Sequence, residues 1–298
     1  MKKPSKNGVL DLPELVRPDV AEVAQYTRNE AMMLVGMYYG IQKLRVGASN
    51  KASAHKREVD DLSDPALILA MKGELRKLEK WEARALQTYA EAQPLGRWAM
   101  SQTGVGPVIC AGLLAHIDVT RSNSVAGVWR FAGLDPDMVW EKGQKRPYNA
   151  ALKTICWKLG ESFKKAPGHT RKDKKTGRKV VMRDYSLYER LYRDRKKLEV
   201  RNNNKGLLAG QAAQKLASAA AKKARLSPEQ KKTWQSGKLQ DVGLDRRAMR
   251  YAVKIFLSHF WQVGRELLGL PGARPYAIAY LGHVDEIAIP NWPMAEED

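Results

Sequence analysis

The sequence has few cysteines and no long apolar run. Its 298 residues include two cysteines, Cys110 and Cys156, too few for a disulfide framework, and no Cys/His spacing typical of zinc accompanies them. No run of about eighteen uninterrupted apolar residues occurs, so no membrane span is predicted. The basic N-terminus, MKKPSKNGVLDLPELV, lacks the apolar core of a signal peptide. These absences predict a cytoplasmic chain without a metal site or a cofactor.

Acidic residues are scarce relative to basic ones. The chain has 32 Asp and Glu against 52 Lys and Arg, a net charge of +20. Such a surplus favours a polyanionic partner, either nucleic acid or an acidic membrane surface. Sixteen Lys or Arg against five Asp or Glu lie between residues 164 and 205, whereas residues 285–298 form an acidic tail. The positive charge is therefore concentrated in one part of the chain.

Strand alternation is also missing, and helical periodicity predicts an all-α fold. Residues 1–17 are predicted to be a flexible arm and residues 18–95 a helical region. Pro18 and Asp19 stand where a first helix would begin, and a polar connector is expected at 47–64. Ser63 is expected to cap a second, amphipathic helix. This helix, within 63–93, would form a coiled-coil arm with the first helix or self-associate with a second chain.

The stretch TGVGPVICAGLLAHI (residues 103–117) is the sharpest local signal. Gly104 and Gly106 permit a tight turn, and Pro107 begins an apolar helix, as in a helix-hairpin-helix. Bare backbone N–H groups at such a turn, together with the helix N-terminus, can hold a phosphate. A tight corner between two packed helices is the alternative. The fold expected is a helical arm followed by a helix-hairpin-helix domain over residues 96–284.

Residues 103–136 resemble the C-terminal segment of the DEDD insertion-sequence transposases, the IS one-ten group, which is related to pilin-gene inverting recombinases. That segment has a G-[IV]-G-P turn, a small and Leu-rich helix, and a helix that ends in A-G-L-x-P. The matching residues here are Gly104 to Pro107, Ala111 to Asp118, and Ala132 to Pro136. The likeness extends over about residues 98–268, with basic insertions at 166–182 and 203–243. It implies a DNA partner, DNA recombination and transposition.

The sequence departs from that family at its catalytic residues. The family carries a RuvC-like α/β domain with four acidic metal ligands, whereas Asp60, Asp61 and Asp64 lie here in the polar connector. The family's serine nucleophile is absent from DMVWEKGQKRPYN (residues 137–149). No catalytic residue is therefore predicted, and the main expectation is a DNA-binding protein without its own catalysis. Two alternatives stay open: a transposase or recombinase subunit that completes its site with a partner, and a structured-RNA-binding or assembly protein.

The candidate DNA-binding residues form the turn and three basic groups. They are Gly104, Val105, Gly106 and Val108 in the turn; Lys142, Lys145, Arg146 and Lys153 near the next long helix; Lys172, Lys174, Lys175, Arg178 and Lys179 in a solvated loop; and Arg246, Arg247 and Arg250 at the start of the last helix. Cations at a helix N-terminus oppose its dipole, which favours an anionic partner for the last group. A solvated helix face is the alternative for each basic group.

The later helices are predicted from their apolar spacing. A helix that starts with Pro147 would bury one stripe, Leu152, Ile155, Leu159 and Phe163, and the last helix would bury Ala252, Ile255, Phe256, Phe260, Val263 and Leu267. Between them an Ala-rich helix over residues 207–224 and a helix start at Ser227 are expected.

Several other residues are predicted to belong to the core. His116 and His259 lie among apolar residues and are expected to be satisfied core histidines. Tyr185, Tyr188 and Tyr192 could stack on bases, but their spacing favours a helix core. The eight tryptophans are expected to serve packing.

Overall fold

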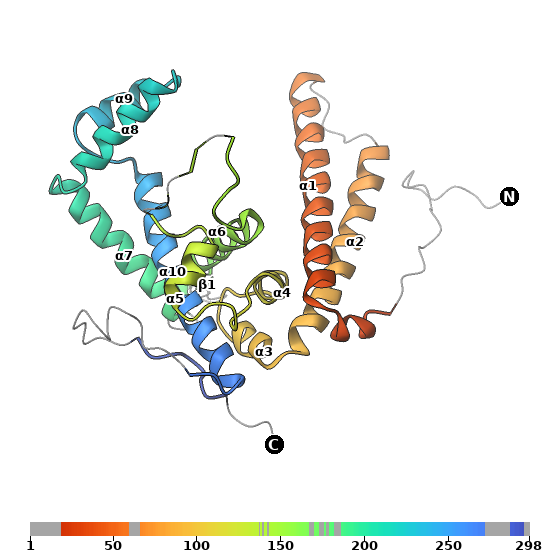
Figure 1. Ribbon diagram of the computed structural model, residues 1–298. Coiled ribbons are helices and arrows are strands. Elements are labelled where there is room, and N and C mark those ends of the chain that lie inside the picture. Colours follow the sequence, from red (N-terminus) through yellow and green to blue (C-terminus); the bar gives the residue numbers. More distant parts are fainter. Residues whose placement is uncertain are drawn as a thin grey trace. The chain divides into compact units, whose positions relative to one another are not determined.

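The computed structural model describes residues 19–59, 66–136, 138, 140, 141, 143–166, 170–172, 176, 179–181, 186–271 and 287–294. These residues form an all-α fold, as predicted, with one short two-stranded ribbon (Figure 1). The elements are the 3-10 helix η1 (Ala21–Gln25), helices α1 (Arg28–Val59), α2 (Ala66–Glu91), α3 (Pro94–Met100), α4 (Pro107–His116), α5 (Val125–Phe131) and α6 (Ala150–Lys165), strands β1 (Thr170–Lys172) and β2 (Lys179–Val181), and helices α7 (Leu187–Asn204), α8 (Ala209–Ala221), α9 (Pro228–Gln235) and α10 (Asp241–Leu267).

The chain divides into two compact units. The first contains residues 1–100 and 106–118, and the second contains residues 101–105 and 119–298. Helix α4 and Gly106 therefore belong to the first unit, whereas Gly104 and Val105 of the preceding turn belong to the second. The sequence division at residues 95–96 assigned both to the C-terminal domain.

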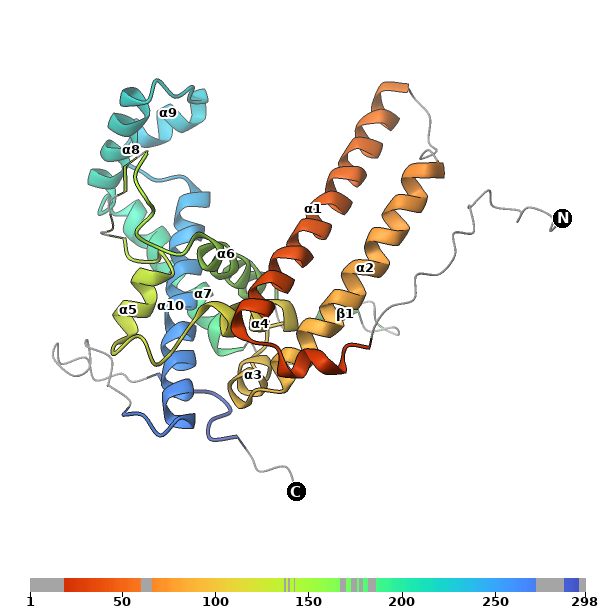
Figure 2. The same ribbon diagram turned by 45° about the vertical axis from the view of Figure 1, so that its right-hand side comes forward.

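In the first unit, α1 and α2 lie side by side and both contact α4 (Figures 1 and 2). Leu86, Tyr89, Trp98 and Leu113 are buried there. Between α1 and α2, Glu79 accepts hydrogen bonds from Arg45, from Gln42 at 3.1 Å and from Tyr38 at 3.4 Å. The predicted helical pair is thus present, while its coiled-coil character and its self-association stay predictions.

Two expectations for the first unit are wrong. The polar connector at 47–64 is helical as far as Val59, because the segment has no proline and is rich in Ala, Lys, Arg and Glu, which favour helix. Ala52 within it is buried. The first α-helix begins at Arg28, where Thr27 and Glu30 form a reciprocal capping box. Ser63, Asp60, Asp61 and Asp64 lie outside the described residues, as do Pro18 and residues 1–17.

Several apolar side chains of the helical pair are exposed. Although the centre of α1 is apolar nearly all round, Met33, Met37 and Leu44 of this helix are more than half exposed. The same is true of Leu67 and Met71 of α2. Among the described residues, no helix has the length and apolar character needed to cross a membrane.

Helix α10 is the centre of the second unit and packs against α5, α6 and α7. The predicted apolar stripe of α6, which consists of Leu152, Ile155, Leu159 and Phe163, is fully buried. This helix begins at Ala150, three residues later than Pro147 suggested, since Asn149 is its N-cap and accepts a hydrogen bond from Leu152 N at 3.0 Å. On α10, Ala252, Phe256, Phe260 and Val263 are buried as predicted, whereas Ile255 is only half-buried and Leu267 is exposed.

Charged side chains join α6, α7 and α10. Asp245 of α10 is buried and accepts hydrogen bonds from Lys164 of α6 and Tyr192 of α7, both at 2.5 Å, and from Lys196 of α7 at 3.5 Å. Burial alone would raise the pKa of Asp245, but these hydrogen bonds and the two ammonium charges hold the pKa below its usual value. The carboxylate therefore stays charged and fixes three helices at one point.

Helices α8 and α9 form a hairpin between α7 and α10. The predicted Ala-rich helix and the Ser227 helix start are both present, and Ser227 forms a capping box with Gln230. The hairpin has a small apolar core of Leu208, Ala212, Leu239 and Leu244. Asn203 closes its base, because its side chain accepts from Leu239 N at 2.8 Å and donates to Leu239 O at 3.0 Å.

The loop predicted at 166–182 is wrong in part. Its ends pair as the antiparallel strands β1 and β2, with Lys172 opposite Lys179. Thr170, Val180 and Val181 favour this extended conformation, but the run of basic residues between them masked the signal. Lys174, Lys175 and Arg178 lie outside the described residues.

The predicted core residues of α7 and α10 meet in one cluster. Tyr188 stacks on Phe163 and donates a hydrogen bond to His259 Nδ1 at 2.9 Å, while His259 Nε2 donates to Ile287 O at 3.1 Å. His259 is therefore a satisfied core histidine, as predicted, and Tyr188 and Tyr192 are core residues as well. His116 is only half-buried, and Tyr185 lies outside the described residues. Burial lowers the pKa of His259 to about 4.

We expect His259 to make the fold sensitive to mild acid. Its folded pKa of about 4 lies below the unfolded value of about 6.5, so the unfolded state binds the proton first as pH falls. Its contribution to the free energy of unfolding is complete above pH 6.5 and decreases by about 3 kcal/mol down to pH 4. Chemical denaturation of the native protein and of His259→Gln across this range measures it. A difference between the two that stays constant with pH would contradict the prediction.

Candidate nucleic-acid interface

The glycine turn between α3 and α4 is packed against the second unit's own helix α6. Gly104 has a φ of +97°, and a Cβ at this position would lie 2.9 Å from Cδ1 of the buried Phe163. Its carbonyl accepts a hydrogen bond from Ser162 Oγ at 2.6 Å. Val105 is buried, and its N–H donates to Gln102 O at 3.0 Å. These contacts give Gly104 and Val105 a packing role.

Gly106 differs from Gly104 in its surroundings. It is the N-cap of α4, with an ordinary φ of −89°, and a Cβ there would meet nothing within 4 Å. Its backbone is therefore the part of the turn that an outside group can approach. Val108, one residue into α4, is half-buried. Phosphate contact at the turn stays a prediction for these residues.

The A-G-L segment after α5 has a physical explanation of its own. Gly133 has a φ of +65°, Gly133 N donates to Arg130 O at 3.0 Å, and Leu134 N donates to Trp129 O at 2.9 Å. This is a Schellman C-cap, which strongly favours glycine. A Cβ on Gly133 would lie 2.9 Å from the Tyr148 ring and 3.0 Å from Cδ of Lys153. The cap turns the chain toward α6 and α10.

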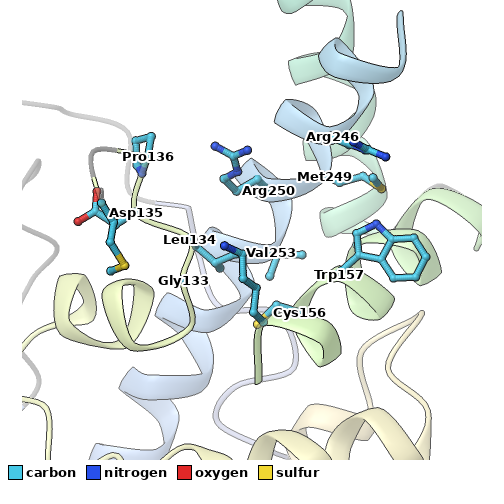
Figure 3. Close-up of a pocket in the computed structure, with 13 residues that line it drawn as sticks. Gly133, Leu134, Asp135, Pro136, Cys156, Trp157, Arg246, Met249, Arg250 and Val253 are labelled. Carbon is cyan, nitrogen blue, oxygen red and sulfur yellow. The ribbon is translucent and has the colours of Figure 1, made fainter. Parts of the chain in front are cut away.

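A pocket of about 350 Å³ lies where this cap meets α6 and α10 (Figure 3). Its size is at the lower end for small-ligand pockets. Its lining residues are Gly133, Leu134, Asp135, Pro136, Met138, Lys153, Cys156, Trp157, Gly160, Arg246, Met249, Arg250 and Val253. Three of the predicted DNA-binding residues, Lys153, Arg246 and Arg250, therefore meet at one place.

The cations of this pocket have few partners within the chain. No carboxylate forms a salt bridge with Arg246 or Arg250 among the residues that the structure describes. Lys153 lies over the Tyr148 ring, 4.1 Å from its centroid. Asp135, the one acidic lining residue, pairs with Arg130 at 3.2 Å. In Figure 3 the Asp135 carboxyl points away from Arg250.

Arg250 has an unusual electrostatic environment for a cation. Burial lowers its pKa, the nearby charge of Arg247 lowers it further, and Glu199 opposes both effects. The guanidinium remains charged, since an Arg pKa starts above 12, and its side chain is exposed, so an anion that enters the pocket can reach it.

Arg247, the neighbour of these two arginines, is committed to the fold. It donates to Glu199 Oε2 at 2.7 Å and to Gln211 Oε1 of α8 at 2.6 Å. Glu199 is buried and also accepts from Arg195 at 2.8 Å. Arg247 thus neutralises a buried carboxylate and ties the α8–α9 hairpin to α10.

The other predicted basic residues are dispersed. Lys145 and Arg146 are exposed, and Arg146 lies over the Trp140 ring at 5.5 Å from its centroid. Neither lines the pocket. Lys172 and Lys179 lie on the β-ribbon, and Lys142 lies outside the described residues.

The sequence reasoning missed two basic surfaces in the second unit. A shallow groove follows α7 beside Lys197, Arg201 and Lys205. The adjoining segment from Lys205 to Lys238, which includes the hairpin, has eight Lys or Arg and one acidic residue. That count was visible in the sequence, but the segment was treated as an insertion, so its charge was not weighed.

The expectation that all eight tryptophans serve packing is wrong for two of them. Trp98 and Trp261 are fully buried, as expected, but Trp140 is 40% exposed and Trp157, which lines the pocket, is 54% exposed. The signal was present in α6, because residue 157 falls opposite the apolar stripe of this helix.

In the described part of the chain, no group of three His, Cys, Asp or Glu side chains is placed to hold a metal ion. Residues 19–59 and 66–100 contain no strand. Comparison of the chain with family models, with curated proteins and with solved structures found no match.

Two glycine variants separate the packing and phosphate roles of the turn. We expect Gly104→Ala to destabilise the protein by about 1–3 kcal/mol, because a Cβ meets Phe163 and the positive φ is strained. Gly106→Ala should cost less, at most about 1 kcal/mol, because a Cβ there meets nothing and the cost is that of a poorer N-cap. Thermal unfolding measures both, and duplex-DNA affinity of Gly106→Ala then tests phosphate contact at the turn. Equal destabilisation by the two substitutions would contradict this assignment.

Proposed function

We propose that the protein binds DNA through its phosphate backbone, on a cationic surface of the second unit, without catalysis of its own. The observation that carries the proposal is the meeting of Lys153, Arg246 and Arg250 at one pocket. Two of these cations have no carboxylate in salt-bridge contact among the described residues. Arg247 is held by Glu199 and Gln211, whereas the side chains of Arg246 and Arg250 are exposed and accessible to a partner.

The electrostatics of the pocket favour an anionic ligand. A guanidinium whose pKa is lowered by burial and by a second guanidinium is stabilised when a phosphate approaches. Arginine also matches phosphate geometry with two parallel hydrogen bonds. A net charge of +20 adds long-range attraction for a polyanion.

Basic surfaces near the pocket extend the proposed contact. Arg246 and Arg250 flank Arg247, which bonds to Gln211 on α8, so the pocket and the hairpin share the N-terminal part of α10. The hairpin cations and the α7 groove then offer further phosphate contacts. Such contacts position a duplex without reading its sequence. Resemblance of residues 103–136 to transposases supports DNA as the polyanion.

The pocket side chains support binding rather than covalent chemistry. Cys156, the thiol that lines the pocket, is buried, and burial raises its pKa to about 12. The nucleophilic form of cysteine is the thiolate, which is negligible at neutral pH under these conditions. Burial raises the pKa of Cys110 to about 12 as well.

Removal of the charges of Arg246 and Arg250 should weaken both the affinity for DNA and the dependence of that affinity on salt. The native protein should lose at least about tenfold in affinity for duplex DNA between about 50 and about 200 mM salt. Arg246→Gln/Arg250→Gln should bind about tenfold more weakly at low salt, and the slope of log affinity against log salt should fall by about 2. Fluorescence anisotropy of a labelled duplex measures both quantities.

A matched control removes the same charge elsewhere. Arg76→Gln/Lys77→Gln neutralises two exposed cations of α2 in the first unit. It should leave affinity within about twofold of the native protein, because neither residue lines the pocket. Equal losses in both double variants, or salt-independent binding, would overturn the proposal. If structured RNA competes for the protein better than the duplex does, the proposed partner is RNA and not DNA.

A further inference from the structure

Trp157 stands at the rim of the cationic pocket with its indole half exposed. Its 54% exposure is unusual beside the buried Trp98 and Trp261. Figure 3 shows Trp157 of α6 rising toward Met249 and Arg246 of α10. None of the described residues forms a hydrogen bond with its indole N–H. A large aromatic ring placed in this way offers one free face beside positive charge.

The floor of the same pocket is apolar. It consists of Leu134, Cys156, Met249 and Val253, all of which are buried. Gly160 lets α6 and α10 approach each other there, since a Cβ on it would lie 3.1 Å from Cβ of Met249. One pocket thus combines an apolar floor, an aromatic wall and three cations.

We propose that this pocket takes one unpaired nucleotide of the bound DNA. The base stacks on Trp157 over the apolar floor, and its flanking phosphates contact Arg246, Arg250 and Lys153. A volume of about 350 Å³ admits one nucleotide but not a base pair with its backbone. Phosphate alone would not need the tryptophan, and an apolar ligand would not need the cations. This inference rests on the proposed DNA binding and adds the kind of DNA that is preferred.

The test compares three labelled duplexes of one sequence by fluorescence anisotropy. The first is fully paired, the second carries a single bulged thymidine, and the third carries an abasic nucleotide at the bulge. The native protein should bind the thymidine bulge about tenfold more tightly than the paired duplex, which is the effect of one stacked base. The abasic bulge should lose most of that gain, because it bends the DNA equally but presents no base.

Variants at the tryptophan assign the gain to the pocket. Trp157→Ala should abolish the preference for the thymidine bulge, so that the variant binds the bulged and the paired duplex with equal affinity. Trp157→Phe should retain part of the preference, since a smaller ring still stacks. Trp140→Ala, a control at another exposed tryptophan that lies outside the pocket lining, should keep the preference intact. Thermal unfolding of each variant should match the native protein, because both side chains are exposed.

The outcomes separate this inference from the proposed function. Equal affinity for all three duplexes, or equal affinity for the thymidine and abasic bulges, overturns the nucleotide pocket and leaves backbone binding in place. A preference that survives Trp157→Ala, or one lost equally in Trp140→Ala, also overturns it. Absence of binding to every duplex overturns both proposals.

Discussion

The second unit depends on one buried carboxylate, Asp245. A charge removed from water is costly unless it is paired and hydrogen-bonded, and here Lys164, Tyr192 and Lys196 supply the partners from two other helices. Replacing any of them would leave a charge or a polar group unmatched. The interaction therefore fixes the rotation of α10 about its axis next to α6 and α7. That rotation decides where every side chain of its N-terminal half points.

The arginines that follow Asp245 show the consequence. Residues 246 and 250 are four apart and share one helix face, which borders the pocket with Trp157. Arg247 is turned about 100° away and meets the buried Glu199. Adjacent arginines thus have different roles: Arg247 neutralises a buried carboxylate, whereas Arg246 forms no salt bridge with any residue that the structure describes. The net charge of the chain does not distinguish these two kinds of arginine, but the salt-bridge partners of each side chain do.

This distinction explains how much could be predicted from the sequence. Helical periodicity predicted the all-α fold and the buried stripe of α6, because burial follows from the period of one helix. The same period placed Trp157 on the outer face, although its exposure was not inferred. The partners of Arg247 and Arg250 could not be predicted, since Glu199 comes from another helix. The predicted end of the first helix was wrong, because residues 47–59 are polar like a connector but consist largely of residues that favour a helix.

The glycines that carry the resemblance to transposases need a separate argument. Gly104 is required because Phe163 fills the space of a side chain, and Gly133 because a Schellman cap crowded by Tyr148 admits no Cβ. Both requirements come from packing, so these glycines would be needed in this fold whether or not DNA binds. Evidence for a ligand must instead come from groups whose placement packing leaves unexplained. In the second unit those groups are Arg246 and Arg250, which form no salt bridge among the described residues, and the exposed indole of Trp157. All three line one pocket.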